Sequence, residues 1–111
     1  MREAYTAVTV RGETWAGEVE TEPYEAAWAG QCVAFVRALA TTGRVDGGTV
    51  AVEISPDGIH WVAEGTTFPL PSEAEAITFA RVANFGHFLR LKASVPEGAS
   101  CTVMVSLALK E

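Results

Sequence analysis

Two runs of alternating apolar residues on either side of a Pro-Asp-Gly turn constrain this chain more than any other feature. The apolar residues of each run share one side of it: Val50, Val52 and Ile54 in the first run, and Ile59, Trp61 and Ala63 in the second. A period of two is typical of strands with one buried face. Pro56 fixes φ, Asp57 can bond its own backbone, and Gly58 tolerates the positive φ that closes a turn. Residues 49–64 therefore predict a β-hairpin, with Trp61 as a core anchor of its second strand.

Stretches with strand character recur at short spacing along the rest of the chain. They cover residues 5–11, 14–21, 31–40, 77–82, 87–95 and 101–109, with glycine- and proline-containing connections between them. Residues 65–73 contain two prolines, which cannot donate to a strand ladder and so indicate a crossover or a sheet edge. Only residues 22–30 are rich enough in Ala and Glu to allow one helical turn.

These strands together predict the fold class. Seven or eight short strands without a convincing helix indicate an all-β fold, an antiparallel β-sandwich with a jelly-roll-like arrangement. The 111 residues, of which 49% are hydrophobic, fit a single domain over residues 1–111. Residues 31–40 are apolar on both sides, as expected of a strand in the middle of a layered structure. We expect residues 1–12 to form an N-terminal arm that adds to a partner's sheet, with Tyr5, Val8 and Val10 as its contacts.

The charge of the chain bears on its partners. The formal net charge is -6, and the eight Lys and Arg residues are scattered along the chain. This argues against nucleic acid as a partner, because phosphate contacts need clustered basic residues. Residues 17–28 contain four glutamates, Glu18, Glu20, Glu22 and Glu25, and no basic residue. The stretch fits either an exposed, solvated strand edge or a contact surface for a basic partner.

Neither a membrane nor a disulfide framework is indicated by the sequence. The first residues lack the apolar core of a secretory signal, and no apolar run has the length of a membrane-spanning helix. We therefore expect no signal peptide and no membrane partner. The two cysteines, Cys32 and Cys101, are too few for a disulfide framework and too far apart for a Cys-x-x-Cys motif. They are either small reduced core residues or, where their strands are neighbours, a single bridge.

Side chains suited to catalysis or metal binding are few. The chain has no Gly-x-Ser-x-Gly turn, and its two histidines, His60 and His87, fall in predicted strands. A metal site made from these histidines and Asp57 lacks a further good ligand. Glu53 and Glu64 flank the hairpin, but solvated acids on a strand face explain them better than a glycosidase pair does. We therefore expect a protein that is not an enzyme and binds no cofactor or metal.

Three aromatic residues in the least regular part of the chain, Trp15, Tyr24 and Trp28, are candidate contacts. Exposed aromatic residues in loops often bind sugars or another protein. In the other interpretation they close the open ends of the sandwich, since Trp is usually largely buried. The sequence leaves both interpretations open.

Several motifs of the chain resemble those of small β-sandwich virion proteins of tailed bacteriophages. The resemblance rests on residues 39–61, a Gly-rich loop that leads into a Ser-Pro-Asp-Gly-x-x-Trp hairpin, on residues 86–95, and on the last strand, 102–110. Phe88 stands where that family often has tyrosine. The resemblance implies a non-enzymatic structural protein, above all a capsid decoration protein, that forms homo-oligomers and contacts capsid or other virion proteins. It also implies assembly in the host cytoplasm and a location in the virion.

A second resemblance is to discoidin-like and other carbohydrate-binding sandwiches. They share a Ser-x-Asp-Gly-x-x-Trp hairpin and a strand similar to residues 86–91. This resemblance implies a glycan-binding module in which Trp15, Tyr24 or Trp28 stacks on a sugar ring. Because such domains are usually longer and secreted, the virion interpretation is favoured. Neither resemblance supplies a catalytic residue.

Overall fold

The computed structural model describes residues 4–111, and all regular elements in that range are β-strands. They are β1 (Ala4–Trp15), β2 (Glu18–Glu20), β3 (Tyr24–Glu25), β4 (Gln31–Thr42), β5 (Thr49–Ser55), β6 (Val62–Pro69), β7 (Ile77–Ala83), β8 (Phe88–Ser94) and β9 (Ser100–Lys110). The helical turn expected in residues 22–30 is wrong, because β3 pairs with β8 and the Ala26 N–H donates to the His87 carbonyl at 2.8 Å. Tertiary hydrogen bonds override the weak helix propensity of that stretch.

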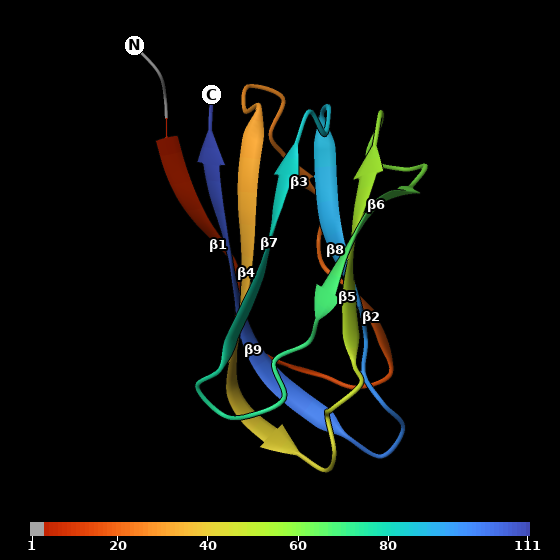
Figure 1. Cartoon of the computed structure of the whole chain (residues 1–111). Coiled ribbons are helices and arrows are strands. Elements are labelled where there is room, and N and C mark those ends of the chain that lie inside the picture. The colour runs from red at the N-terminus through yellow and green to blue at the C-terminus, as the bar shows by residue number, and fades with distance from the viewer. Residues whose placement is uncertain (1–3) are drawn as a thin grey trace.

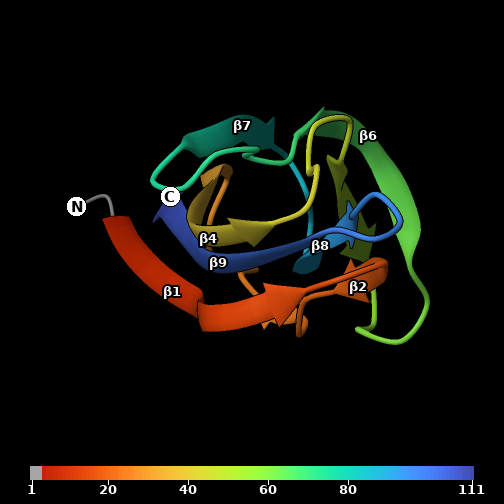
Figure 2. The same cartoon turned by 90° about the horizontal axis from the view of Figure 1, so that it is seen from below.

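The strands form two antiparallel sheets that face each other (Figures 1 and 2). One sheet has the strand order β1-β9-β4-β7, and the other has the order β2-β8-β5-β6, with β3 also paired to β8. The pairs are nested, since β1 joins β9, β2 and β3 join β8, β4 joins β7, and β5 joins β6. Such nesting arises when one long hairpin rolls into two sheets, which is a jelly roll. The predicted all-β, jelly-roll-like sandwich is confirmed.

The core lies between the two sheets and is built from alternating strand residues. In β9 every second residue from Cys101 to Leu109 is buried, and the residues between them are partly exposed. The second sheet contributes Leu89 and Leu91 from β8 and Val50 from β5, all of which are buried. Complete burial of one such side chain stabilises the fold by about 1.5–3 kcal/mol. The period-2 patterns in the sequence therefore identified the inward faces of these strands correctly.

The predicted N-terminal arm is part of the sheet β1-β9-β4-β7, as far as its residues are described. Residues 1–3 lie outside the described residues, and from Ala4 onward the chain forms β1, which pairs with β9 along its length. Val10 is buried in the core and is not available as a contact. The arm prediction is corrected for residues 4–12, because pairing with β9 already satisfies one side of their backbone. Being at the end of the strand order, β1 keeps its other side as a sheet edge.

The hairpin between β5 and β6 is present, but its connection is longer than the sequence predicted. β5 ends at Ser55 and β6 begins at Val62, so residues 56–61 form a loop that includes Pro56. The Asp57 Oδ1 atom accepts the N–H groups of Ile59 and His60, each at 2.8 Å, and Gly58 has the expected positive φ of 79°. Because Ile59 is 75% exposed and Ala63 is exposed as well, the predicted buried side of the second run, made of Ile59, Trp61 and Ala63, is wrong.

Trp61 lies on the outer side of the second sheet and not in the core. The ring is half-buried, and the guanidinium carbon of Arg90 lies 4.3 Å from its centroid. Arg90 also donates its Nε–H to Glu53 Oε1 at 2.8 Å. The core-anchor prediction is wrong because Trp61 still belongs to the loop, where strand alternation does not fix the side that a residue occupies.

Cys32 and Cys101 are buried and free. Cys32 pairs with Leu109 near one end of the β4–β9 ladder, and Cys101 pairs with Thr41 near the other end. A disulfide needs Cα atoms within about 7 Å, so this placement excludes the alternative of a bridge. Burial raises the pKa of the Cys32 thiol to about 11.

Replacing the fully buried Trp15 tests the core. We expect Trp15→Ala to lower the free energy of unfolding by about 3–5 kcal/mol, because it removes a large side chain from between the sheets. The matched control is Trp28→Ala, since Trp28 is 36% exposed and its loss should cost less than about 1 kcal/mol. Urea unfolding followed by circular dichroism measures both. Equal losses for the two variants would contradict the placement of Trp15.

The Asp57 loop makes stability depend on pH. Hydrogen bonds from the backbone and side chain of His60 and the backbone of Ile59 hold the pKa of Asp57 below its ordinary value of 3.8. The carboxylate therefore stabilises the fold above that value, and this contribution is lost as the pH falls below it toward the lower folded-state pKa. We expect Asp57→Asn to lower the urea midpoint at neutral pH and to approach wild type at about pH 2. Asp46→Asn, which removes the charge of another exposed loop aspartate, is the control for the loss of a surface charge.

Candidate functional site

The outward side of the sheet β1-β9-β4-β7, here called the outer face, is apolar at its centre. Phe35 of β4 is in register with Phe79 of β7 and with Ser106 of β9, and the two phenylalanine ring centroids are 5.9 Å apart. The apolar side chains around this pair are Val33, Ile77, Met104 and Ala108. Ile77 is 57% exposed and Phe79 is 47% exposed, so this face is open to solvent.

The charges of the outer face have one sign. Its outward-pointing strand positions within residues 4–111 carry Arg11, Arg37, Arg81 and Lys110 and no acidic residue. Arg37 pairs with Glu75, which lies in the turn before β7. The guanidinium carbon of Arg81 lies 5.1 Å from the Phe79 ring centroid, a cation–π contact. An apolar centre with a basic rim therefore faces outward from a chain whose net charge is -6.

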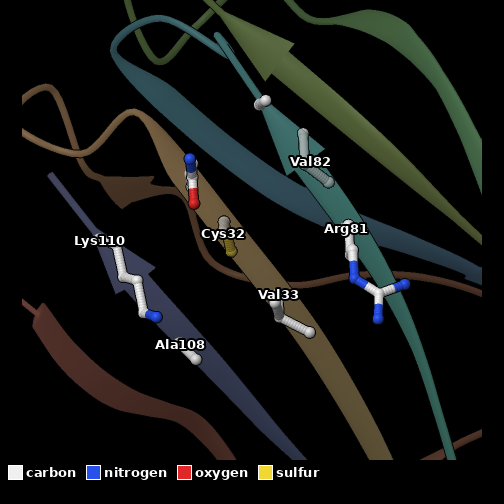
Figure 3. Close-up of a pocket in the computed structure, with 8 residues that line it drawn as sticks. Cys32, Val33, Arg81, Val82, Ala108 and Lys110 are labelled. Atoms are coloured by element: carbon white, nitrogen blue, oxygen red, sulfur yellow. The ribbon is translucent and has the colours of Figure 1, made fainter.

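A shallow hollow of about 340 Å³ lies within the outer face (Figure 3). Val33 and Ala108 form part of its lining, and Arg81 and Lys110 lie on strands to either side of β4. Its lining combines the small side chains of Ala83 and Ala108 with the long ones of Arg81 and Lys110. Such a site suits an apolar anchor from another protein, with acidic groups next to it to meet the two cations.

The sequence contained the signal for this face, but its interpretation was incomplete. The second apolar set of residues 31–40 predicted a strand in the middle of a layered structure. β4 does lie inside its sheet, between β9 and β7. However, among residues 4–111 no second layer covers its outward side, where Val33, Phe35 and Leu39 are half-buried. The expectation of an internal layer is corrected, and the two-sided pattern becomes the mark of an exposed apolar face.

A second hollow, here called the β1 groove, brings together three of the predicted contacts. Tyr5 and Val8 of β1 and Tyr24 of β3 line a groove of about 380 Å³ beside the sheet edge. Tyr5 is 59% exposed, and Tyr24 is half-buried. Burial raises the pKa of Tyr24 above its ordinary value, with smaller contributions from Tyr5 and Cys32.

The other two predicted aromatic contacts, Trp15 and Trp28, do not line the β1 groove. Trp15 is fully buried, and its Nε1–H donates to Glu13 Oε1 at 3.1 Å. Its prediction as a contact is therefore wrong, and the other interpretation, a residue that fills the sandwich, holds for it. Trp28 follows β3 and is 36% exposed, which leaves it accessible.

The residues considered for catalysis or metal binding each have a local partner. His60 Nδ1 lies 2.7 Å from Asp57 Oδ2, and His87 Nε2 lies 3.3 Å from Glu25 Oε1. Glu53 binds Arg90, and Glu64 accepts the Thr66 N–H at 3.0 Å. Within residues 4–111 there is no group of three or more metal-ligating side chains. In the same part of the chain there is no helix with the length and apolar composition of a membrane span.

Comparison with known proteins gives structural neighbours only. No protein-family description matches the chain, and no curated protein is significantly similar to it in sequence. The fold is similar to that of the PBSX exported protein XepA, with a TM-score of 0.59, 12% identity, and coverage of 98% of this chain and 36% of that one. It is also similar to a chain of infectious bursal disease virus, Gx strain, with a TM-score of 0.51, 13% identity, and coverage of 98% and 32%. The chain thus spans about a third of each neighbour, and at these identities the similarity shows the fold alone.

The β1 groove can be tested by titration, because Tyr5 and Tyr24 are the two tyrosines of the chain. In Tyr5→Phe the remaining tyrosinate signal belongs to Tyr24. We expect its pKa to stay above 10.0, because burial is the largest cause, but to lie below that of Tyr24 in the wild type, because the Tyr5 charge is gone. Tyrosine chemical shifts followed against pH measure both values. An unchanged pKa of Tyr24 would show that the two phenols do not interact.

Proposed function

We propose that the chain is a non-enzymatic structural protein of a phage particle that decorates and stabilises the capsid through protein–protein contacts. The uncovered apolar outer face is the observation that carries this proposal. Support also comes from the fold, which is similar to that of a chain from a virus structure and to that of a PBSX exported protein.

The composition of the outer face favours a protein partner. Soluble monomers rarely expose a large contiguous apolar patch, and the centres of interfaces are enriched in aromatic residues, Met and Arg. Phe35, Phe79, Met104 and Arg81 fit that composition. β1, β9, β4 and β7 have 12, 11, 12 and 7 residues. At a rise of about 3.3 Å per residue and a strand spacing of about 4.8 Å they present about 650 Å² per partner, somewhat less than the roughly 800 Å² of a standard interface. Docking by shape and buried area needs no reacting group.

The carbohydrate-binding alternative has lost part of its basis. Trp15 is in the core and cannot stack on a sugar. Tyr24 lines the β1 groove, and Trp28 is the remaining exposed tryptophan of the predicted set. Glycan-array binding that Trp28→Ala abolishes would support this alternative over the capsid role.

A charge placed on the outer face should prevent particle binding. The measurement is co-sedimentation of purified chain with particles made by the genome that encodes it. We expect Phe79→Asp to weaken binding at least about tenfold, because it removes an aromatic ring from the centre of the face and places there a charge that docking would have to desolvate. Since Phe79 is about half exposed, this variant should keep the wild-type circular dichroism spectrum.

The matched control is Ile59→Asp, which places the same charge on an exposed apolar residue of the β5–β6 loop. It should bind as the wild type does. Undiminished binding by a folded Phe79→Asp would refute the outer face as the docking surface.

A further inference from the structure

We propose that the outer face of one copy docks on residues 18–28 of a second copy, so that copies associate head to tail. The inference rests on the proposed function, in which the outer face is a docking surface, and it names the partner of that surface.

Like charges disfavour two outer faces packed against each other. The outward strand positions described for this face carry Arg11, Arg37, Arg81 and Lys110, with no acidic residue among them. Among residues 4–111, Arg81 has no carboxylate partner and rests on the Phe79 ring. Juxtaposed like charges at an interface strongly disfavour association. The partner of the outer face is therefore an acidic surface.

This chain carries such a surface on its other sheet. Residues 18–28, here called the acidic segment, comprise β2, β3 and the turn after them and contain four glutamates without a basic residue. Glu20 lies 3.3 Å from Arg90, and Glu25 lies 3.3 Å from His87. Within residues 4–111, Glu18 and Glu22 have no ion-pair partner.

The acidic segment also presents an apolar anchor. Trp28 is 36% exposed and follows Glu22 and Glu25 in the same stretch of chain. An exposed tryptophan in a segment that also carries carboxylates complements a hollow lined by Arg81 and Lys110, because Trp is prominent among interface hot spots and the charges are opposite. The two surfaces are therefore complementary: each includes an exposed apolar side chain, and their charges are opposite.

The positions of the two surfaces require a second molecule. The outer face belongs to β1, β9, β4 and β7, whereas the acidic segment pairs with β8 at the edge of the other sheet (Figure 2). The acidic segment borders the rim of its own outer face, since Glu22 lines the β1 groove with Arg11 and the Gly30 N–H donates to the Lys110 carbonyl at 2.9 Å. The centre of that face, at Phe35 and Phe79, stays open in the same copy, so covering it requires a second copy. A contact between two different surfaces is heterologous, and repeating it closes a ring or extends a filament.

A mixing experiment tests this geometry. Phe79→Asp with Arg81→Glu disables only the outer face, and Trp28→Ser with Glu22→Lys disables only the acidic segment. The replaced side chains are exposed, so both variants should keep the wild-type circular dichroism spectrum. Light scattering after size-exclusion chromatography should show wild-type oligomers and two monomeric variants. An equimolar mixture of the variants should give dimers, because each such pair retains one intact contact.

Two controls test whether the loss of association comes from the charges of the two surfaces or from any added surface charge. Ile59→Asp should assemble as the wild type does. Raising the salt concentration to about 1 M should weaken wild-type association at least tenfold, because the exposed rim charges are then screened. Monomers in the mixture of variants, where the wild type forms oligomers, would overturn the head-to-tail contact. A wild type that is monomeric at every concentration would overturn it as well.

The inference and the proposed function fail in different ways. If the wild type stays monomeric while Phe79→Asp loses particle binding, self-docking is overturned and the capsid role stands. If the mixed variants form dimers but the wild type does not bind particles, self-docking stands and the capsid role fails. Binding of a single-stranded oligonucleotide that the outer-face variant loses would assign the outer face to nucleic acid and overturn self-docking.

Discussion

Packing of the two inward sheet faces against each other is the interaction on which the rest of this structure depends. β9 contributes five alternating buried residues, from Cys101 to Leu109, and pairs with both β1 and β4. Leu89 and Leu91 of β8 face them from the other sheet. Because each sheet buries one face in this way, the other two faces are left for solvent or for partners. The question of function is therefore a question about those outward faces.

The two outward faces differ in how their side chains are satisfied. On the second sheet, Arg90 binds Glu53 and Glu20 and lies against Trp61, so its charges are paired locally. On the four-stranded sheet, Phe35 and Phe79 occupy the centre, and basic side chains surround them. The first arrangement is that of a surface in contact with water. The second has the apolar centre and polar rim of an interface.

The alternation of apolar residues explains both where the sequence predicted the structure correctly and where it did not. Alternation predicted the strands from Gln31, Thr49, Phe88 and Ser100 onward, because a half-buried strand must alternate. It failed at Trp61, where a loop held by Asp57 replaces the expected strand pairing. It also predicted a buried position for the second side of β4, since a sequence pattern records apolarity and not what covers it. Long-range pairing placed Tyr5 beside Tyr24, which local patterns do not report.

The sequence by itself determined the fold class, the inward faces of most strands, the turn chemistry of Asp57 and Gly58, and the excess of acidic residues. These follow from local rules: the period of the side chains, the conformational freedom of glycine, and composition. Tertiary structure decided that Trp15 fills the core, that Cys32 and Cys101 lie at opposite ends of one ladder, and that Arg11, Arg37, Arg81 and Lys110 share one sheet face. Those facts depend on which strands become neighbours, and strand pairing joins residues that are distant in the chain.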